Sequence, residues 1–236
     1  MVASAEYDPI IVDATLSPER ARELIHRRRE STKLDYKQSY SGTTRDKVEV
    51  TKDLVAMANT AGGYIVFGVN DAGERTGLDE AALPALDEAR LRAQVQSYLS
   101  AGLDLFVDSS IVLEDRHFAI VTVLRSARSP LVFSSLGTYA NEENGGKQTT
   151  VFRPGDVFVR RGSASQRWDQ EDVQAIYARV VERERERWLA EVLPDIQRLI
   201  GMASPAPASS RAPREILLEP EDVFERSVRS MLRSSR

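Results

Sequence analysis

Two segments decide the fold of this chain: ESTKLDYKQS at residues 30–39 and KDLVAMANTAGGYIVFGVNDAGERTGL at residues 52–78. The first alternates apolar and charged residues, which is the pattern of a strand with one face on a core. Leu34 and Tyr36 are predicted to point inward, and Asp35 and Lys37 to point outward. The acid and the base therefore share one face of the predicted strand.

The second segment predicts a helix, a strand and a turn. Its apolar residues recur at three- and four-residue spacing, so residues 46–59 are expected to form an amphipathic helix that ends at Gly62 and Gly63. The apolar run 64–69 is then typical of a buried strand. Asn70 and Asp71 follow at the strand end, where sheet proteins commonly carry their chemistry.

The remaining elements follow from local signals. Ser17 and Pro18 open a helix as its N-cap and its first helical residue. Further helices are predicted over 86–100 and 169–200, a hairpin over 105–113 and 118–124, a strand over 157–161 and a polar loop over 137–150. The predicted fold class is α+β, with a mixed, mostly antiparallel sheet packed with helices and a C-terminal helical extension.

One principal domain with appendages is expected, because 236 residues suit one large domain. An N-terminal arm (1–16) precedes the domain (17–180). A helical extension (181–202), a linker rich in Ala, Ser and Pro (203–213) and a short terminal helix (214–236) follow it.

The composition favours a cytoplasmic protein. No apolar run reaches the ~18 residues of a membrane helix, and the N-terminus lacks the layout of a secretion signal. The absence of cysteine excludes disulfides, a thiol nucleophile and Cys-ligated zinc. The net charge of −4 opposes an overall electrostatic grip on nucleic acid. However, Lys33, Lys37, Lys47 and Lys52 lie close together, so the motif has either a locally basic face or a solvated, charged helix face.

The order of these motifs resembles the Schlafen/AlbA-type domain, a family also described as divergent AAA or DNA-binding domains. The matching residues are Glu30, the triplet 35–37 (DYK), the segment 56–64 (AMANTAGGY), residues 68–71 (GVND), Gly73 and the pair 77–78 (GL). Residues 126–130 (SARSP) and 157–163 (VFVRRGS) match more weakly, so the resemblance covers roughly residues 20–180. It implies an α+β domain that acts on nucleic acid.

The leading hypothesis is a metal-dependent endoribonuclease of Schlafen type. Phosphodiester cleavage at neutral pH needs a hard divalent cation such as Mg²⁺ or Mn²⁺, which carboxylates bind, and a lysine can offset charge on the phosphate. The resemblance implies that Glu30, Asp35 and Asp71 hold the metal and that Lys37 faces the scissile phosphate of RNA. Asp35 stands where the family has the longer glutamate, and the sequence Asn70-Asp71 leaves two candidates for the third position.

The main alternative is a non-catalytic DNA- or RNA-binding module in regulation or defence. Arg160, Arg161 and Lys33 are candidate phosphate donors, and Trp168 is a candidate stacking ring for single-stranded or structured nucleic acid. The pair 62–63 (GG) either lets backbone N–H groups approach a phosphate or ends a helix beside a buried strand. An ATP-binding role has no Walker motif to support it.

A third hypothesis is an oligomerising interaction subunit. The predicted C-terminal helix carries Trp188, Leu189, Leu193 and Ile196 at three- and four-residue spacing. Such a stripe most often packs on its own domain, and the alternative is a homodimer formed through residues 181–200.

Overall fold

The computed structural model describes residues 10–128, 130–142 and 145–202. The chain divides into two compact units, Met1–Arg185 and Glu186–Arg236. The predicted linker (203–213) and terminal helix (214–236) lie outside the described residues, as does most of the predicted N-terminal arm.

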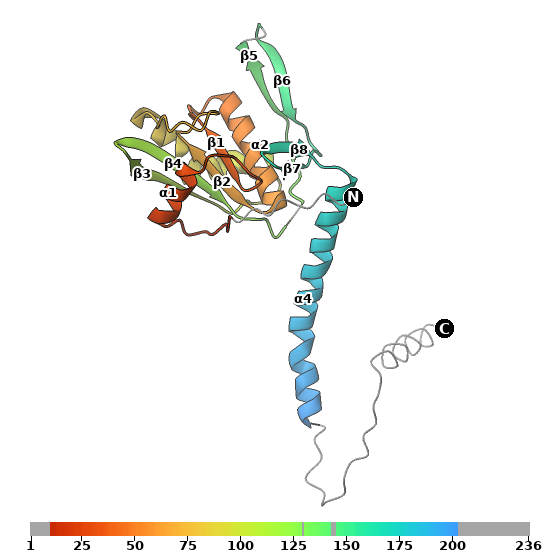
Figure 1. Cartoon of the computed structure of the whole chain (residues 1–236). Helices are drawn as coiled ribbons and strands as arrows, with labels where there is room; N and C mark the ends of the chain where they lie inside the picture. The colour runs from red at the N-terminus through yellow and green to blue at the C-terminus, as the bar shows by residue number, and fades with distance from the viewer. Residues whose placement is uncertain (1–9, 129, 143–144, 203–236) are drawn as a thin grey trace, which may run out of the picture. The chain divides into compact units, whose positions relative to one another are not determined.

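A four-stranded sheet in the order β1-β2-β4-β3 forms the centre of the first unit (Figure 1). Its strands are β1 (Leu34–Lys37), β2 (Gly63–Phe67), β3 (Leu105–Leu113) and β4 (Arg116–Val123). β1 runs parallel to β2, whereas the β2–β4 and β3–β4 pairs are antiparallel. The predictions of a mixed, mostly antiparallel sheet and of the β3–β4 hairpin are confirmed.

The helix α2 (Thr44–Thr60) makes the crossover that the parallel pair β1–β2 requires. A capping box begins this helix: Thr43 Oγ1 accepts from the Asp46 N–H, and the Asp46 carboxylate accepts from the Thr43 N–H. At the other end Gly62 has a φ of +74° and donates its N–H to Met57 O at 2.8 Å. The helix predicted over 46–59 is therefore confirmed, and it begins two residues earlier, at Thr44.

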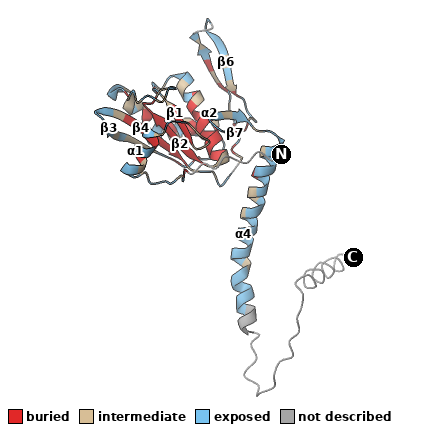
Figure 2. Cartoon of the chain, viewed as in Figure 1, coloured by how far each residue is buried: buried red, intermediate tan, exposed pale blue. Residues whose placement is uncertain are grey.

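Helices cover both faces of the sheet. The helix α1 (Pro18–His26) shares one core with Tyr64 and Val66 of β2, whereas α2 and α3 (Glu88–Tyr98) share the other core with Ile65 and Phe67. Successive side chains of a strand point to opposite faces, so β2 supplies both cores and is buried along its whole length. Figure 2 shows the buried residues gathered in the central strands and α2.

Two hairpins complete the first unit, β5 (Gly137–Asn141) with β6 (Lys147–Phe152), and β7 (Phe158–Arg161) with β8 (Ala164–Arg167). The β5–β6 hairpin corrects the prediction of a polar loop over 137–150. Most of its side chains are polar, so the sequence lacks the apolar alternation of a half-buried strand. Long-range packing holds it instead, because the buried Phe152 ring stacks on Phe133 with their centroids 3.8 Å apart.

The helix α4 (Gln170–Met202) confirms the long helix predicted over 169–200. Large apolar side chains that it exposes are Val173, Tyr177, Val181, Trp188, Leu189, Leu193 and Ile196. A short 3₁₀ helix, η1 (Glu80–Leu86), precedes α3. None of the helices in the described residues has the length and hydropathy needed to span a bilayer.

Candidate functional site

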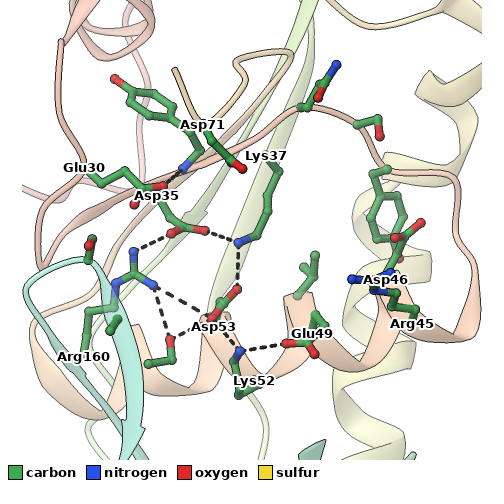
Figure 3. Close-up of a pocket in the computed structure, with 18 residues that line it drawn as sticks. Glu30, Asp35, Lys37, Arg45, Asp46, Glu49, Lys52, Asp53, Asp71 and Arg160 are labelled. Atoms are coloured by element: carbon green, nitrogen blue, oxygen red, sulfur yellow. Dashed lines mark hydrogen bonds and ion pairs between the residues drawn. The ribbon is translucent and has the colours of Figure 1, made fainter. Parts of the chain in front are cut away.

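A cavity of about 550 Å³ lies among residues of β1, α2 and the β7–β8 hairpin (Figure 3). Charged side chains dominate its lining: the carboxylates are Glu30, Asp35, Asp46, Glu49, Asp53 and Asp71, and the cations are Lys37, Arg45, Lys52 and Arg160. With six carboxylates and four cations, this lining is acidic in total. The three predicted acids and the predicted lysine thus meet in one pocket.

β1 places Asp35 and Lys37 on one face, as predicted, but that face is not turned to solvent. Asp35 is only 3% exposed. Leu34 and Tyr36 pack into the core on the α1 side, so the alternation of the strand directs Asp35 to the side of α2. Because α2 and β7 cover this face, the prediction that Asp35 points outward is wrong.

Asp35 and Lys37 belong to a network of ion pairs that joins β1 to α2 and β7 (Figure 3). Lys37 Nζ lies 2.7 Å from Asp35 Oδ2 and 3.0 Å from Asp53 Oδ2. The Arg160 guanidinium donates to Asp35 Oδ1. The other Asp53 oxygen, Oδ1, accepts from Ser165 Oγ at 2.7 Å. Two buried carboxylates therefore share one lysine, and each has a further polar partner on its other oxygen.

The charges of this network stabilise one another. Burial acts to lower the pKa of Lys37, but the Asp53 and Asp35 carboxylates outweigh it and raise this pKa well above its usual value. Burial likewise acts to raise the pKa of Asp53, but Lys37 and Lys52 outweigh it, so this pKa is lowered. Lys37 is therefore a permanent cation at neutral pH, and Asp53 a permanent anion.

Glu30 lines the same pocket from the segment before β1. Its Oε1 accepts from the Tyr36 N–H at 3.0 Å, which fixes the carboxylate beside the strand. Burial raises the pKa of Glu30; the Tyr36 N–H opposes this shift, and the charge of Asp35 adds to it. Glu30 is thus a carboxylate whose negative charge is not fully compensated.

Asp71, and not Asn70, reaches the pocket from the turn after β2. Asp71 is exposed and lines the cavity. Asn70 Oδ1 instead accepts from the N–H groups of Ala72 and Glu74, at 3.0 and 2.9 Å. Asn70 therefore shapes the turn, which leaves Asp71 as the acid that accompanies Glu30 and Asp35.

The two arginines predicted as phosphate donors, Arg160 and Arg161, are both paired with acids of the protein. Arg160 is 3% exposed and committed to Asp35, so its prediction as a phosphate donor is wrong. Arg161 is exposed, but it pairs with Asp169 and Asp172 at the start of α4. It does not line the pocket, and its role in nucleic-acid binding stays a prediction.

Lys33 and Trp168 also lie outside the pocket lining. Lys33 Nζ donates to Ile10 O at 2.7 Å and so holds the N-terminal segment on the sheet. Trp168 is half-buried, and its backbone N–H donates to Val157 O. Lys33 therefore has a structural contact, and the predicted roles of Lys33 as a phosphate donor and of Trp168 as a stacking ring stay predictions.

Gly62 and Gly63 are buried against backbone and do not line the pocket. A Cβ on Gly62 would lie 2.8 Å from Val123 O, and one on Gly63 would lie 2.9 Å from Lys33 O. Both positions need glycine because the chain passes so close. Of the two interpretations of this pair, the structure supports the end of a helix beside a buried strand.

Asp53 is the residue of the site that sequence reasoning missed. It lies on α2 and is 4% exposed, between Leu54 and the half-buried Lys52. Its signal is a carboxylate on the apolar side of an amphipathic helix, where an unpaired charge is strongly disfavoured and a counter-ion must exist. Its partner Lys52 is adjacent in the sequence, but its partners Lys37 and Ser165 come from other elements and could not be read from the sequence.

The carboxylates fit a hard divalent cation in their chemistry, although they do not converge. Asp35 Oδ2 is buried and makes no hydrogen bond besides its ion pair with Lys37. A cation would also relieve the burial of charge on Glu30. No three His, Cys, Asp or Glu side chains among the described residues lie close enough to hold a metal ion. A cation here would keep water in its shell, as Mg²⁺ commonly does.

The fold and the site define an α+β domain with a charged pocket beside its parallel strand pair. The chain belongs to the Schlafen AlbA_2 family: the family model described as "Schlafen, AlbA_2" matches residues 30–169, more than half of the 236 residues. This confirms the resemblance stated from the motifs. Membership of this family associates the chain with a nucleic-acid-related function.

A search of curated proteins finds no match. Among solved structures, the chain is similar to the DIP2311 protein from Corynebacterium diphtheriae, with 13% sequence identity and a TM-score of 0.42. The match covers 66% of this chain and 32% of that protein. The chain therefore spans about a third of the length of this relative.

Proposed function

We propose that the protein is a Mg²⁺- or Mn²⁺-dependent endonuclease that acts on RNA. The observation that carries this proposal is that Glu30, Asp35 and Asp71, from three separate segments, line one pocket with Lys37. Carboxylates with a neighbouring lysine are the groups that phosphodiester hydrolysis needs. Membership of the family supports a nucleic-acid substrate, whereas the choice of RNA as that substrate is our proposal.

Each residue has a distinct proposed role. Glu30, Asp35 and Asp71 would hold the cation, in part through the water of its shell, and the bound cation would stabilise charge on the phosphate and lower the pKa of an attacking water. Lys37, whose side chain is 31% exposed, presents its ammonium to the pocket and binds a phosphate oxygen. Arg160 holds Asp35 in position from the buried side.

A non-catalytic nucleic-acid-binding module is the second candidate. The observation in its favour is that Asp35 and Asp53 already have cation partners in Lys37 and Arg160. Two of the carboxylates are thereby neutralised without a metal. In this case the pocket would be a buried structural network, and the protein would bind nucleic acid without cutting it.

Cleavage by an Asp71→Asn variant discriminates between the two candidates. Asp71 is exposed, so the substitution removes a carboxylate from the pocket without disturbing the core. Purified wild-type protein with Mn²⁺ is expected to nick structured RNA and to stop when a chelator is added. The variant is expected to lose cleavage by at least ~100-fold, since one oriented catalytic group commonly contributes that much, while it retains RNA affinity.

The matched control is Asp115→Asn, which removes an exposed carboxylate from the β3–β4 turn. It should cleave at the wild-type rate. An Asp71→Asn variant that cleaves as fast as wild type would exclude the assigned role of this acid. A wild-type protein that binds RNA but does not cut it with Mg²⁺ or Mn²⁺ would establish the second candidate instead.

A further inference from the structure

The four lysines clustered in the sequence around the motif separate in the structure. Lys33 donates to Ile10 O, and Lys37 and Lys52 pair with acids of the pocket. Only Lys47 among these four is exposed and makes no ion pair with any described residue. Of the four lysines, Lys47 is therefore the one whose charge is available to a polyanion.

Lys47 lines a groove of about 540 Å³ between the start of α2 and α3, which we call the α2–α3 groove. Its other polar lining residues are Tyr40, Ser41, Arg90, Gln94, Ser97 and Tyr98. Arg90 is exposed, and its guanidinium makes a single hydrogen bond, to Pro84 O, within the described residues. No carboxylate of the described residues lines the groove, whereas six line the neighbouring pocket.

A hydrogen-bond network centred on Gln94 lines the groove. Gln94 Nε2 donates to Lys47 O and to Thr51 Oγ1, both at 2.9 Å. Gln94 Oε1 accepts from the Tyr40 hydroxyl at 2.8 Å. One amide thus joins α3, α2 and the loop after β1. The polar groups of this network are satisfied within the protein, so the groups of the groove that attract an anion are its two cations, Lys47 and Arg90.

The groove and the acidic pocket are adjacent, because Tyr40 lines both. A polyanion that approaches the pocket meets an excess of carboxylates, and like charges repel it. Binding therefore needs cations beside the pocket and outside its ion-pair network. Lys47 and Arg90 meet this requirement, and they do so on a protein whose net charge is −4.

We propose that the α2–α3 groove binds the phosphate backbone of a single nucleic-acid strand that continues into the acidic pocket. Lys47 and Arg90 contact successive stretches of the backbone. This inference rests on the proposed nucleic-acid function, and it adds the surface along which the strand lies. It requires binding but no cleavage, so it holds for a nuclease and for a binding module alike.

The test is the salt dependence of binding to a short fluorescent single-stranded RNA. Replacing both cations, Lys47→Gln with Arg90→Gln, should weaken binding and reduce the slope of log K against log salt by about 1.4, since each phosphate contact contributes about 0.7 on a single strand. Adding a cation in the groove, Ser97→Lys, should strengthen binding and steepen the slope by about 0.7. A gain of affinity cannot come from unfolding.

The matched control is Arg22→Gln with Arg128→Gln, which removes the same charge from two exposed positions outside the groove. It should leave the slope near the wild-type value. Equal slopes for the groove variant, the control and the wild type would overturn the groove while leaving the proposed function intact. A wild-type protein that binds no RNA and no single-stranded DNA would overturn both.

Discussion

Asp35 is a buried carboxylate whose two oxygens face different cations, Arg160 at Oδ1 and Lys37 at Oδ2. Removing one member of a buried ion pair leaves the other charge without a partner, which is much more destabilising than replacing the whole pair. Arg160, with a side chain 1% exposed, cannot turn to water for compensation. Asp35 therefore stabilises the fold as a buried counter-ion in addition to lining the pocket.

The Asp35→Asn variant is expected to lower the free energy of unfolding by about 3–5 kcal/mol, because it leaves the buried Arg160 with only the more distant Asp53 carboxylate, 3.9 Å away. Urea unfolding followed by circular dichroism measures this. Asp71→Asn, in which the acid is exposed, should stay within about 0.5 kcal/mol of wild type. Equal stabilities for the two variants would contradict the role of Asp35 as a structural counter-ion. Loss of cleavage in Asp35→Asn alone therefore says little about catalysis.

The raised pKa of Glu30 predicts the direction in which stability changes with pH, and stability measurements can detect that direction. The folded protein holds the Glu30 proton more tightly than the unfolded chain, so this group's contribution to stability falls as pH rises above its ordinary value of 4.5. Glu30→Gln removes the buried charge and keeps an acceptor for the Tyr36 N–H. The variant should therefore be more stable than wild type at pH 7, and the difference should shrink as pH falls toward 4.5.

Thermal melting at several pH values checks this prediction. Glu19→Gln is the control of opposite sign, since backbone hydrogen bonding at the start of α1 lowers the pKa of Glu19. That variant should be less stable than wild type at pH 7. If Glu30 belongs to the catalytic site, the Glu30→Gln variant should be more stable than wild type and should also lack cleavage activity. A Glu30→Gln protein less stable than wild type at pH 7 would contradict the assigned environment.

At the junction between α2 and β2, two adjacent glycines end the helix and begin the strand. Gly62 ends the helix in a left-handed conformation, and Gly63 begins a strand that is buried on both faces. The chain can turn there only because both positions lack a side chain. The conspicuous glycine pair of the motif is thus a requirement of packing, and the charged pocket lies elsewhere.

Gly62→Ala is expected to lower stability by about 2–3 kcal/mol, because the new Cβ meets Val123 O and a positive φ strains any other residue. Gly155→Ala is the matched control, since its φ of +90° is also positive but no atom lies within 4 Å of a Cβ there. It should show only the conformational penalty of about 1 kcal/mol. Melting temperatures compare the two. At temperatures where Gly62→Ala is folded, its RNA affinity should equal that of wild type.

At the scale of the whole molecule, the exposed apolar side chains of the second unit raise the question of self-association. Trp188, Leu189, Leu193 and Ile196 are between 37% and 58% exposed. Burying them in a partner would contribute several kcal/mol at about 25 cal/mol per Å². The loss of freedom on association consumes much of this, so a homodimer of modest affinity stays our prediction.

Light scattering on the full chain tests this prediction. Leu189→Glu with Leu193→Glu places two charges in the stripe and should shift the mass from dimer to monomer without lowering the melting temperature of the first unit. The matched control is Ala190→Glu with Gln197→Glu, which adds two charges at exposed positions beside the stripe. It should remain a dimer. A wild-type protein that is a monomer at every concentration tested would reject the homodimer.

Local patterns in the sequence determined most of the secondary structure. The signals that predicted these elements each span only a few neighbouring residues. They are the apolar spacing of α2, the capping residues of α1 and the alternation of β1. A single sequence therefore contains them in full. The motif over 30–78 likewise sufficed for the family. Candidate acids could be chosen from it because the family's pattern ties residue type to position.

Only the tertiary structure decided which charges face which. Asp35 is buried because α2 and β7 cover its side of β1, and its partner Arg160 lies 125 positions away. The same packing of α2 and β7 on β1 places Asp53 in the site and buries Arg160. The β5–β6 hairpin is packed through contacts such as that of Phe152 with Phe133, which no local sequence pattern predicts. Burial and ion pairing depend on which surfaces meet, and that is a property of the packed chain and not of any one segment.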